Sequence, residues 1–389
     1  MKVNRHKPNF FWVVALLGAA IFGLFAFGAG TPASAQIVES PYAQQNIVGG
    51  KSIDYLRVSM SALAGLVLFI YGVTRLAQGL EYVAGDRMRA WVSRFTSNRF
   101  VGVVTGTVAT AALESSSVTI IMVIAMVSAG VLTFVQSLGV VLGSNIGTAL
   151  GAQIIALEIN LYAPLLMVAG ILFHFLGKQE FQKHLGLVLL GFGLLFFGLD
   201  VIEGALTPFR GHPVFLSWMQ RLGDQAALGA LVGAVFTVLI QSSSATVAIV
   251  ITLASAGMMP LSTGIALMLG AEVGTCADTL VATIGRGRPA LRTGVFHFLF
   301  NLVGAVIGIA FAPQLARLAI WISGAGGIVR QIANAQLLFN IISVVVVIGF
   351  LPMIARALES LLPDTAAERV QPALTPVEGA AQSENPLQV

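Results

Sequence analysis

The chain has 389 residues, of which 57% are hydrophobic and only 10% charged, with 42 glycines in addition. Soluble domains are only about 45–50% apolar with glycine included. The composition is therefore too apolar, and the charged residues are too few, to cover the surface of a soluble protein of this size. The single cysteine, Cys276, excludes a disulfide scaffold. The net charge is +4, but the basic residues are too sparse for a nucleic-acid surface. The composition predicts an all-α polytopic membrane protein.

Residues 1–35 have the pattern of a signal peptide or an uncleaved signal anchor. A basic start (Lys2 and Arg5) precedes an apolar stretch over 10–27, and Ala33-Ser34-Ala35 forms a small-residue cleavage motif. The apolar stretch is long for a signal peptide, so cleavage and retention both stay open. In either case Gln36 begins outside the cytoplasm.

Seven further segments are apolar and of spanning length. They are 57–80, 134–157, 161–176, 185–202, 261–284, 293–313 and 335–354. Two other apolar regions, 100–130 and 228–257, are each interrupted by a polar cluster. With Gln36 outside, most basic residues lie in cytoplasmic connections only if both interrupted regions enter and leave on one side. This parity predicts two re-entrant hairpins and a cytoplasmic C-terminus, with 363–389 as a disordered tail.

An internal repeat organises the chain. Residues 102–148 and 229–275 align without a gap at an offset of 127, with 17 identities in 47 positions. The predicted domains are therefore repeat 1 over 57–184, repeat 2 over 185–313 and an additional helix over 335–354. Three crossings separate the two hairpins, so they enter from opposite faces. Two inverted-topology repeats, each with a re-entrant hairpin and a discontinuous helix, are the architecture of secondary transporters, with the binding site near the membrane midplane.

The polar clusters in the hairpins carry the chemistry. Each hairpin has two apolar arms too short to span the membrane, and a Ser-Ser-Ser triplet follows Glu114 in the first and Gln241 in the second. Hydroxyls and freed carbonyls there can coordinate a cation such as Na⁺. The N-terminus of the second arm offers N–H groups and a positive dipole end to an anion. The alternative is a Ser-rich motif that only packs helices closely.

A second pair of motifs lies at 143–148 and 270–275. Glycines flank a polar residue midway along a spanning segment, which predicts a break in each helix. Asn145 and Glu272 hold equivalent positions, and both segments end in Gly-Thr, at Thr148 and Thr275. Intramembrane carboxylates are costly and usually functional, so we expect cation ligands here, with Asp278 one turn further on. The alternative is a kink whose polar residue is satisfied by a neighbouring helix.

With these motifs, residues 63–354 resemble the type II sodium–phosphate cotransporter family. The resemblance rests on Gln-Ser-Ser-Ser-Ala-Thr from Gln241, its near-copy in the first repeat, and the Gly-Thr segments. It implies Na⁺-coupled symport of inorganic phosphate by alternating access in a bacterial cell membrane. The implied phosphate-binding residues are Ser115, Ser116, Ser117, Gln241, Ser242, Ser243 and Ser244. The predicted Na⁺ ligands are Glu114, Asn145, Thr148, Gln241, Glu272, Thr275 and Asp278.

Three acids depart from the family pattern. Glu114 stands where the family usually has a second Gln, Glu272 replaces an Asn, and Asp278 is additional. These acids could bind extra Na⁺, or H⁺ if burial neutralises them. Another anion, H⁺ coupling, a passive channel and a non-transporting scaffold therefore stay open. Common hydrolase, metalloprotease and nucleotide-binding motifs do not occur, and we expect neither an enzyme nor a cofactor beyond the coupling ion.

Overall fold

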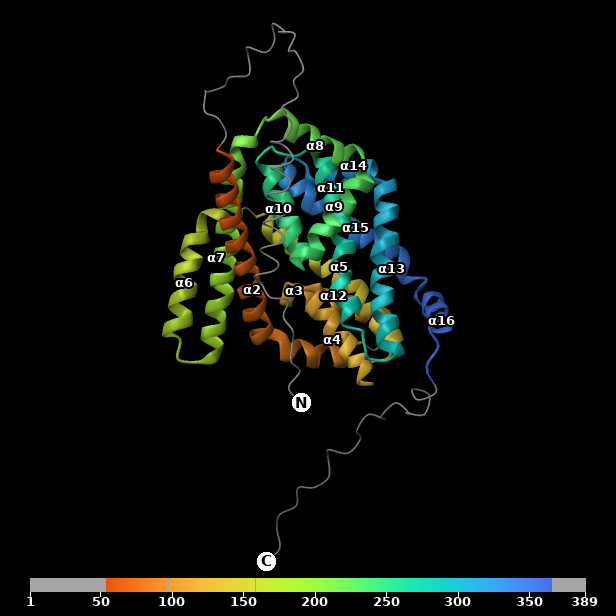
Figure 1. The fold of residues 1–389 in the computed structure, drawn as a ribbon. Helices are drawn as coiled ribbons and strands as arrows, with labels where there is room; N and C mark the ends of the chain where they lie inside the picture. The colour runs from red at the N-terminus through yellow and green to blue at the C-terminus, as the bar shows by residue number, and fades with distance from the viewer. Residues whose placement is uncertain (1–53, 97, 158, 366–389) are drawn as a thin grey trace, which may run out of the picture. The chain divides into compact units, whose positions relative to one another are not determined.

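The computed structural model describes residues 54–96, 98–157 and 159–365 (Figure 1). The predicted signal segment 1–35 and residues 366–389 of the predicted tail lie outside this part. Every regular element in the described part is a helix, and six helices or helix pairs there are long and apolar enough to cross a bilayer. The protein is therefore an all-α polytopic membrane protein, as its composition predicts.

Fifteen α-helices follow one another in the described part. They are α2 (Tyr55–Arg94), α3 (Arg99–Leu113), α4 (Ser116–Ser128), α5 (Phe134–Ile155), α6 (Ala163–Leu176), α7 (Glu180–Leu206), α8 (Pro213–Asp224), α9 (Ala226–Ile240), α10 (Ser243–Ser255), α11 (Leu261–Gly274), α12 (Cys276–Val281), α13 (Arg288–Ala310), α14 (Ala312–Ser323), α15 (Ile328–Ile348) and α16 (Leu351–Leu361). Short 3₁₀ turns at Ile159–Tyr162 and Thr207–Phe209 precede α6 and follow α7.

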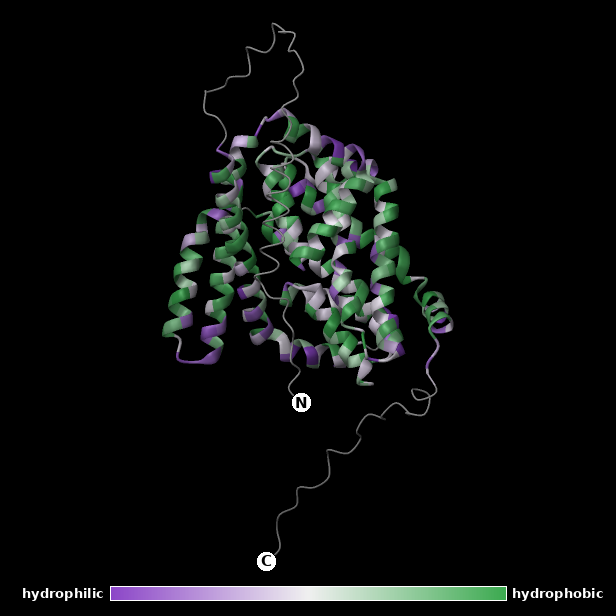
Figure 2. Ribbon diagram, viewed as in Figure 1, coloured by the Kyte–Doolittle hydropathy of each residue, from purple (hydrophilic) through white to green (hydrophobic). Residues whose placement is uncertain are grey.

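Six of the seven predicted spans overlap segments that are long and apolar enough to cross a membrane, and one of these segments, Leu261–Val281, consists of α11 and α12. The segment 161–176 instead forms α6, which has 14 residues and pairs with α7 along its length (Figure 1). Their backbones approach closely, because a Cβ at Gly170 would overlap the backbone of Leu190. Hydrophobic residues cover both helices between hydrophilic ends (Figure 2). This pattern is the one expected of a helix pair that faces lipid.

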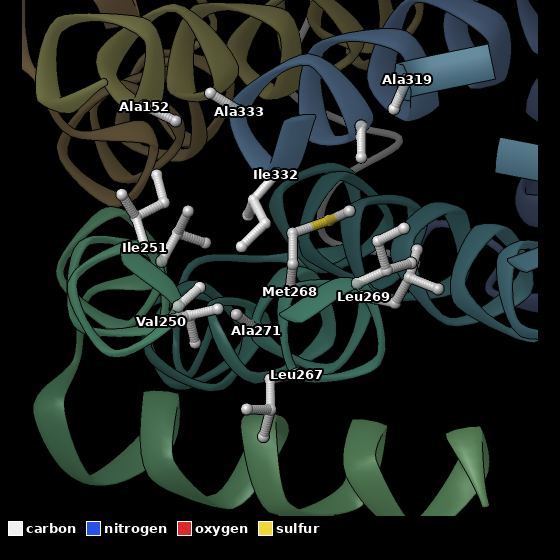
Figure 3. Close-up of a cluster of buried hydrophobic side chains, with 14 of the residues drawn as sticks. Ala152, Val250, Ile251, Leu267, Met268, Leu269, Ala271, Ala319, Ile332 and Ala333 are labelled. Atoms are coloured by element: carbon white, nitrogen blue, oxygen red, sulfur yellow. The ribbon is translucent and has the colours of Figure 1, made fainter. Parts of the chain in front are cut away.

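The described chain forms two compact units. Unit 1 comprises 54–84, 149–275 and 305–339, and unit 2 comprises 85–148, 276–304 and 340–365. Each unit has its own apolar core. In unit 1, side chains from α10, α11 and α15 meet around Met268, Leu269 and Ile332 (Figure 3). In unit 2, Ile120 and Ile124 of α4 pack with Leu138 and Leu142 of α5. Each unit thus contains pieces of both predicted repeats.

The two Ser-triplet regions form matching helical hairpins. The α3–α4 hairpin of unit 2 and the α9–α10 hairpin of unit 1 each pair a 15-residue arm with a 13-residue arm. At 1.5 Å per residue these arms are about 22 and 20 Å long, less than the ~30 Å of a bilayer core. Their lengths and mutual contacts agree with the predicted hairpins.

The predicted break at 143–148 is wrong, whereas at 270–275 the structure has a helix boundary at Thr275. Helix α5 runs through the first without interruption, and α12 follows α11 after Thr275, whose φ of −64° and ψ of −16° are helical. The glycines instead admit neighbouring backbone. A Cβ at Gly143 would overlap the Val103 carbonyl oxygen, and a Cβ at Gly270 would overlap that of Ala230. A single sequence does not distinguish glycines for close packing from glycines for a break.

A helix boundary falls inside the last predicted segment. Residues 335–354 belong to two helices, because α15 ends at Ile348 and α16 starts at Leu351. Pro352 cannot continue a helix but fits the first turn of α16, and Pro313 has the same place in α14. Each short helix buries one face in a unit: Leu315 of α14 in unit 1 and Leu358 of α16 in unit 2.

Candidate functional site

The turn of each hairpin has an unusual backbone conformation. Glu114 (φ 49°, ψ 28°) and Gln241 (φ 61°, ψ 28°) lie in the left-handed region and are the two non-glycine residues with positive φ in the described part. Such a conformation costs of order 1–3 kcal/mol and tends to persist at functional sites. Glycine would adopt it without strain. The presence of Glu and Gln therefore indicates that their side chains matter at these turns.

The first serine of each triplet caps the second arm of its hairpin. Ser115 and Ser242 are extended (φ −155° in both), and each hydroxyl oxygen accepts a hydrogen bond of 3.2 Å from the amide of the residue three positions later. The second serine is buried and the third is partly exposed in both hairpins. The first N–H groups of a helix have no partner within it. Each turn thus presents amide and hydroxyl donors, a donor set suited to an oxyanion.

Two threonine pairs support the turns, and the predicted site residues did not include them. Thr119 and Thr246 each donate a hydroxyl hydrogen bond of 3.1 Å to the carbonyl of the capping serine. In unit 1, Thr237 also donates to the hydroxyl of Thr246 at 2.8 Å. Its counterpart in unit 2, Thr110, is buried, and its side-chain hydroxyl has no hydrogen-bond partner within the described residues. Thr110 and Thr119 are identical to Thr237 and Thr246 at the offset of 127, and this identity is the sequence signal that could have indicated them.

The Gly-Thr segments pack against the hairpins. Gly147 lies against Thr110, one turn before the α3–α4 turn, and Gly274 lies against Thr237, one turn before the α9–α10 turn. Thr148 and Thr275 are therefore held close to the turns of their own units. The polar side chains of α5 also bond within their helix: Asn145 Nδ2 donates to Val141 O at 2.9 Å. This bond lies within α5, so it differs from the alternative of a polar residue satisfied by a neighbouring helix.

The three acids have different surroundings. In unit 2, Asp278 of α12 lies beside Ser117 of α4, so the α3–α4 turn has two acids near it, Glu114 and Asp278. In unit 1, Glu272 is buried, and its Oε1 accepts a hydrogen bond of 2.7 Å from Gln336 Nε2. At an offset of 127, Asp278 corresponds to Gly151. The α9–α10 turn therefore has neutral Gln241 and no counterpart to Asp278.

The described residues contain no group of three or more His, Cys, Asp or Glu side chains that could hold a metal ion. A transition-metal centre built from such residues is thus not found in this part. A cation here would be bound by hydroxyl, amide, carbonyl and single carboxylate oxygens, which are ligands for hard cations. His297, buried in unit 2, contacts Thr279 Oγ1 at 2.9 Å and Cys276 Sγ at 3.7 Å. These contacts account for its burial without a metal.

Comparison with known proteins identifies the family. The family model described as "Na+/Pi-cotransporter" matches residues 68–204 and 211–357, and each segment contains one Ser-triplet hairpin. The chain belongs to the Na⁺/Pi-cotransporter family. The chain is 29% identical to "Uncharacterized protein YqeW" of Bacillus subtilis, over 71% of this chain and 86% of that protein. No solved structure matches.

Other relatives have names that mention phosphate. The chain is 31% identical to "Putative inorganic phosphate export protein YjbB" of Escherichia coli K12 over 65% of this chain, and it spans about half of that protein (47%). It is also 31% identical to the human "Sodium-dependent phosphate transport protein 2B", over 33% of this chain and 20% of the human protein. The resemblance seen in the sequence is therefore confirmed for the family.

Proposed function

We propose that this protein carries inorganic phosphate across a bacterial cell membrane in symport with Na⁺. The observation that carries the proposal is the repeated turn, in which a left-handed polar residue precedes a capping serine in a membrane-embedded hairpin. Such a turn offers donors to an anion and oxygen ligands to a cation within a few ångströms. Membership of the Na⁺/Pi-cotransporter family supports phosphate and Na⁺ as the pair.

The charges around the turns support a division of roles. Residues 241–244 have no acid at the turn, so their hydroxyl and amide groups are proposed to make the main contacts with phosphate. Residues 115–117 offer the same donors, but Glu114 and Asp278 repel an anion and attract a cation. We assign Na⁺ chiefly to the oxygens of Glu114, Asp278 and Thr148 in unit 2. Glu272, Thr275 and Gln241 are the proposed cation ligands in unit 1, with Asn145 a further candidate in unit 2.

The way the chain passes between the units supports inverted repeats. It leaves unit 2 after Thr148 and leaves unit 1 after Thr275, and these positions are 275 − 148 = 127 residues apart, the repeat offset. Residues 85–148 therefore belong to unit 2 and their equivalents 212–275 to unit 1, whereas 149–177 belong to unit 1 and their equivalents 276–304 to unit 2. This exchange is what a two-fold pseudo-symmetry would produce. We propose that the two hairpins enter from opposite faces, that the C-terminus is cytoplasmic, and that transport proceeds by alternating access.

A second candidate function is phosphate export, which differs from the first in the direction of net transport. Relatives named for phosphate export favour an outward carrier, whereas the human relatives are named for sodium-dependent transport. A symporter moves phosphate in whichever direction the Na⁺ gradient points. Under an inward Na⁺ gradient the proposed mechanism therefore takes phosphate up, and an exporter needs another driving ion or a reversed gradient.

Reconstituted protein in liposomes tests the proposal directly. Radiolabelled phosphate uptake is measured with an inward Na⁺ gradient, with K⁺ replacing Na⁺, and with a pH gradient alone, against protein-free liposomes. We expect saturable uptake with Na⁺ and little with K⁺. Uptake driven only by pH would replace Na⁺ with H⁺, and flux linear in phosphate concentration would indicate a passive conduit. Competition by unlabelled sulfate equal to that by phosphate would reject phosphate specificity.

A further inference from the structure

A buried contact in unit 1 joins Glu272 of α11 to Gln336 of α15. The two residues are 1% and 0% exposed, and Gln336 Nε2 donates to Glu272 Oε1 at 2.7 Å. Gln336 matches none of the phosphate or Na⁺ ligands predicted from the sequence. A buried carboxylate needs hydrogen-bond partners, and this one obtains a partner from a helix 64 positions away.

The packing of α11 on α15 fixes the position of this contact. Met268, Leu269 and Ala271 of α11 belong to one apolar cluster with Ile332 and Ala333 of α15, and Figure 3 shows Met268 and Ile332 between the two helices. Glu272 follows Ala271 directly, and Gln336 lies one turn after Ile332 and Ala333. An apolar, closely packed cluster leaves both side chains little freedom to rearrange.

A second internal duplication places Gln336 in context. Residues 299–317 and 338–356 align without a gap at an offset of 39, with nine identities that include Asn301/Asn340 and Pro313/Pro352. Helices α13 and α15 are thus copies, and Gln336 corresponds to His297. His297 contacts Thr279 in unit 2, and Gln336 contacts Glu272 in unit 1. The equivalent positions on the two helices thus make equivalent kinds of contact: His297 of α13 contacts α12 in unit 2, and Gln336 of α15 contacts α11 in unit 1.

We propose that Gln336 is a positioning residue that orients the Glu272 carboxylate for Na⁺. This inference rests on the proposed function, in which Glu272 is a cation ligand. The amide holds one carboxylate oxygen, which sets the orientation of the whole group. An amide is neutral, so it orients the carboxylate without cancelling the negative charge that attracts a cation. Groups that orient metal ligands typically contribute 10–100-fold to metal affinity.

The test compares Gln336→Leu with Gln331→Leu, a matched control on the same helix whose side-chain amide donates to the nearby Gly326 carbonyl at 3.3 Å. Reconstituted protein is assayed for the Na⁺ concentration that half-saturates phosphate flux, and for the phosphate KM at saturating Na⁺. We expect Gln336→Leu to raise the Na⁺ requirement about tenfold while the phosphate KM stays close to that of the wild type. The control should change neither.

Two further variants keep the proposal falsifiable if Gln336→Leu does not fold. Gln336→Met keeps the volume, and Glu272→Gln combined with Gln336→Glu keeps an amide–carboxyl pair but moves the charge to α15. Both are expected to need more Na⁺ than the wild type. A wild-type Na⁺ requirement in any folded variant of this set would overturn the positioning role. Absence of Na⁺-dependent flux in the wild type would instead reject the proposed function itself.

Discussion

The α3–α4 hairpin of unit 2 and the α9–α10 hairpin of unit 1 have nearly the same backbone conformation at their turns, but one turn is acidic and the other is neutral. Their turn residues, Glu114 and Gln241, share a ψ of 28°, and their capping serines share a φ of −155°. One turn lies beside two acids, Glu114 and Asp278, and the other is neutral. The duplication has therefore preserved the hydrogen-bond donors and the backbone geometry of the turns, while the charge beside the turns has diverged. Charge is thus where the two hairpins can differ in function.

The largest expected effect tests whether the two hairpins are packed alike. Gly143→Leu and Gly270→Leu would each drive a side chain into a backbone carbonyl of the hairpin's first arm, Val103 or Ala230. Backbone cannot move aside as a side chain can, so each variant should lose about 3 kcal/mol of stability or more. Size-exclusion profiles and melting temperatures in detergent measure this.

Gly204→Ala is the control, because a Cβ there meets nothing within 4 Å. It should keep a melting temperature equal to or above that of the wild type, since alanine favours the helix. If only one of Gly143→Leu and Gly270→Leu were to misfold, the two hairpins would not be equivalent in packing.

The same glycines show how far the sequence reaches. It located both hairpin turns at the Ser triplets, because polar residues between two short apolar arms admit few other structures. It did not distinguish a broken helix from a tightly packed one at Gly143, since glycine serves both purposes. The sequence also did not predict where α2 ends. Residues 81–94 extend this helix past the predicted span of 57–80, because hydropathy marks the apolar part of a helix and not its end.

Contacts between distant segments were beyond the sequence. The bond between Gln336 and Glu272 joins residues 64 positions apart, and periodicity along either helix does not indicate which buried polar residues will meet. The proximity of Asp278 to Ser117 has the same origin. Proximity along the chain suggested Asp278 as a ligand beside Thr275, whereas in unit 2 it lies beside the α3–α4 hairpin. The ligand roles themselves stay predictions.

The next largest effect compares the third serine of each triplet. Ser244→Ala removes a hydroxyl from the neutral turn, and loss of a hydrogen bond to a charged ligand amounts to about 1.5–3 kcal/mol, or roughly 10–100-fold in phosphate KM. Ser117→Ala is the matched variant at the acidic turn, where Ser117 lies beside Asp278. Its phosphate KM should change less and its Na⁺ requirement more. Equal effects of the two on phosphate KM would contradict the division of roles.

A smaller effect follows from exchanging the turn residues. Gln241→Glu gives the neutral turn a negative charge, which should raise phosphate KM about fivefold, equivalent to about 1 kcal/mol of repulsion in a partly hydrated site. Glu114→Gln makes the opposite change and should raise the Na⁺ requirement with little effect on phosphate KM. Concentration series for each ion separate the two. Should Gln241→Glu leave phosphate KM at its wild-type value, the neutral turn would not be where the anion binds.

The smallest effect concerns the acid that only one hairpin has. Asp278→Asn keeps the shape of the side chain, and the amide oxygen can still accept the hydrogen bond from the Thr279 amide, so the fold should be unaffected. Loss of the charge should raise the Na⁺ requirement of phosphate flux about threefold, in keeping with a partly exposed charge worth less than 1 kcal/mol. Asp224→Asn, at the exposed end of α8, is the control and should behave as the wild type. If both variants matched the wild type, Glu114 alone would account for any cation preference at the acidic turn.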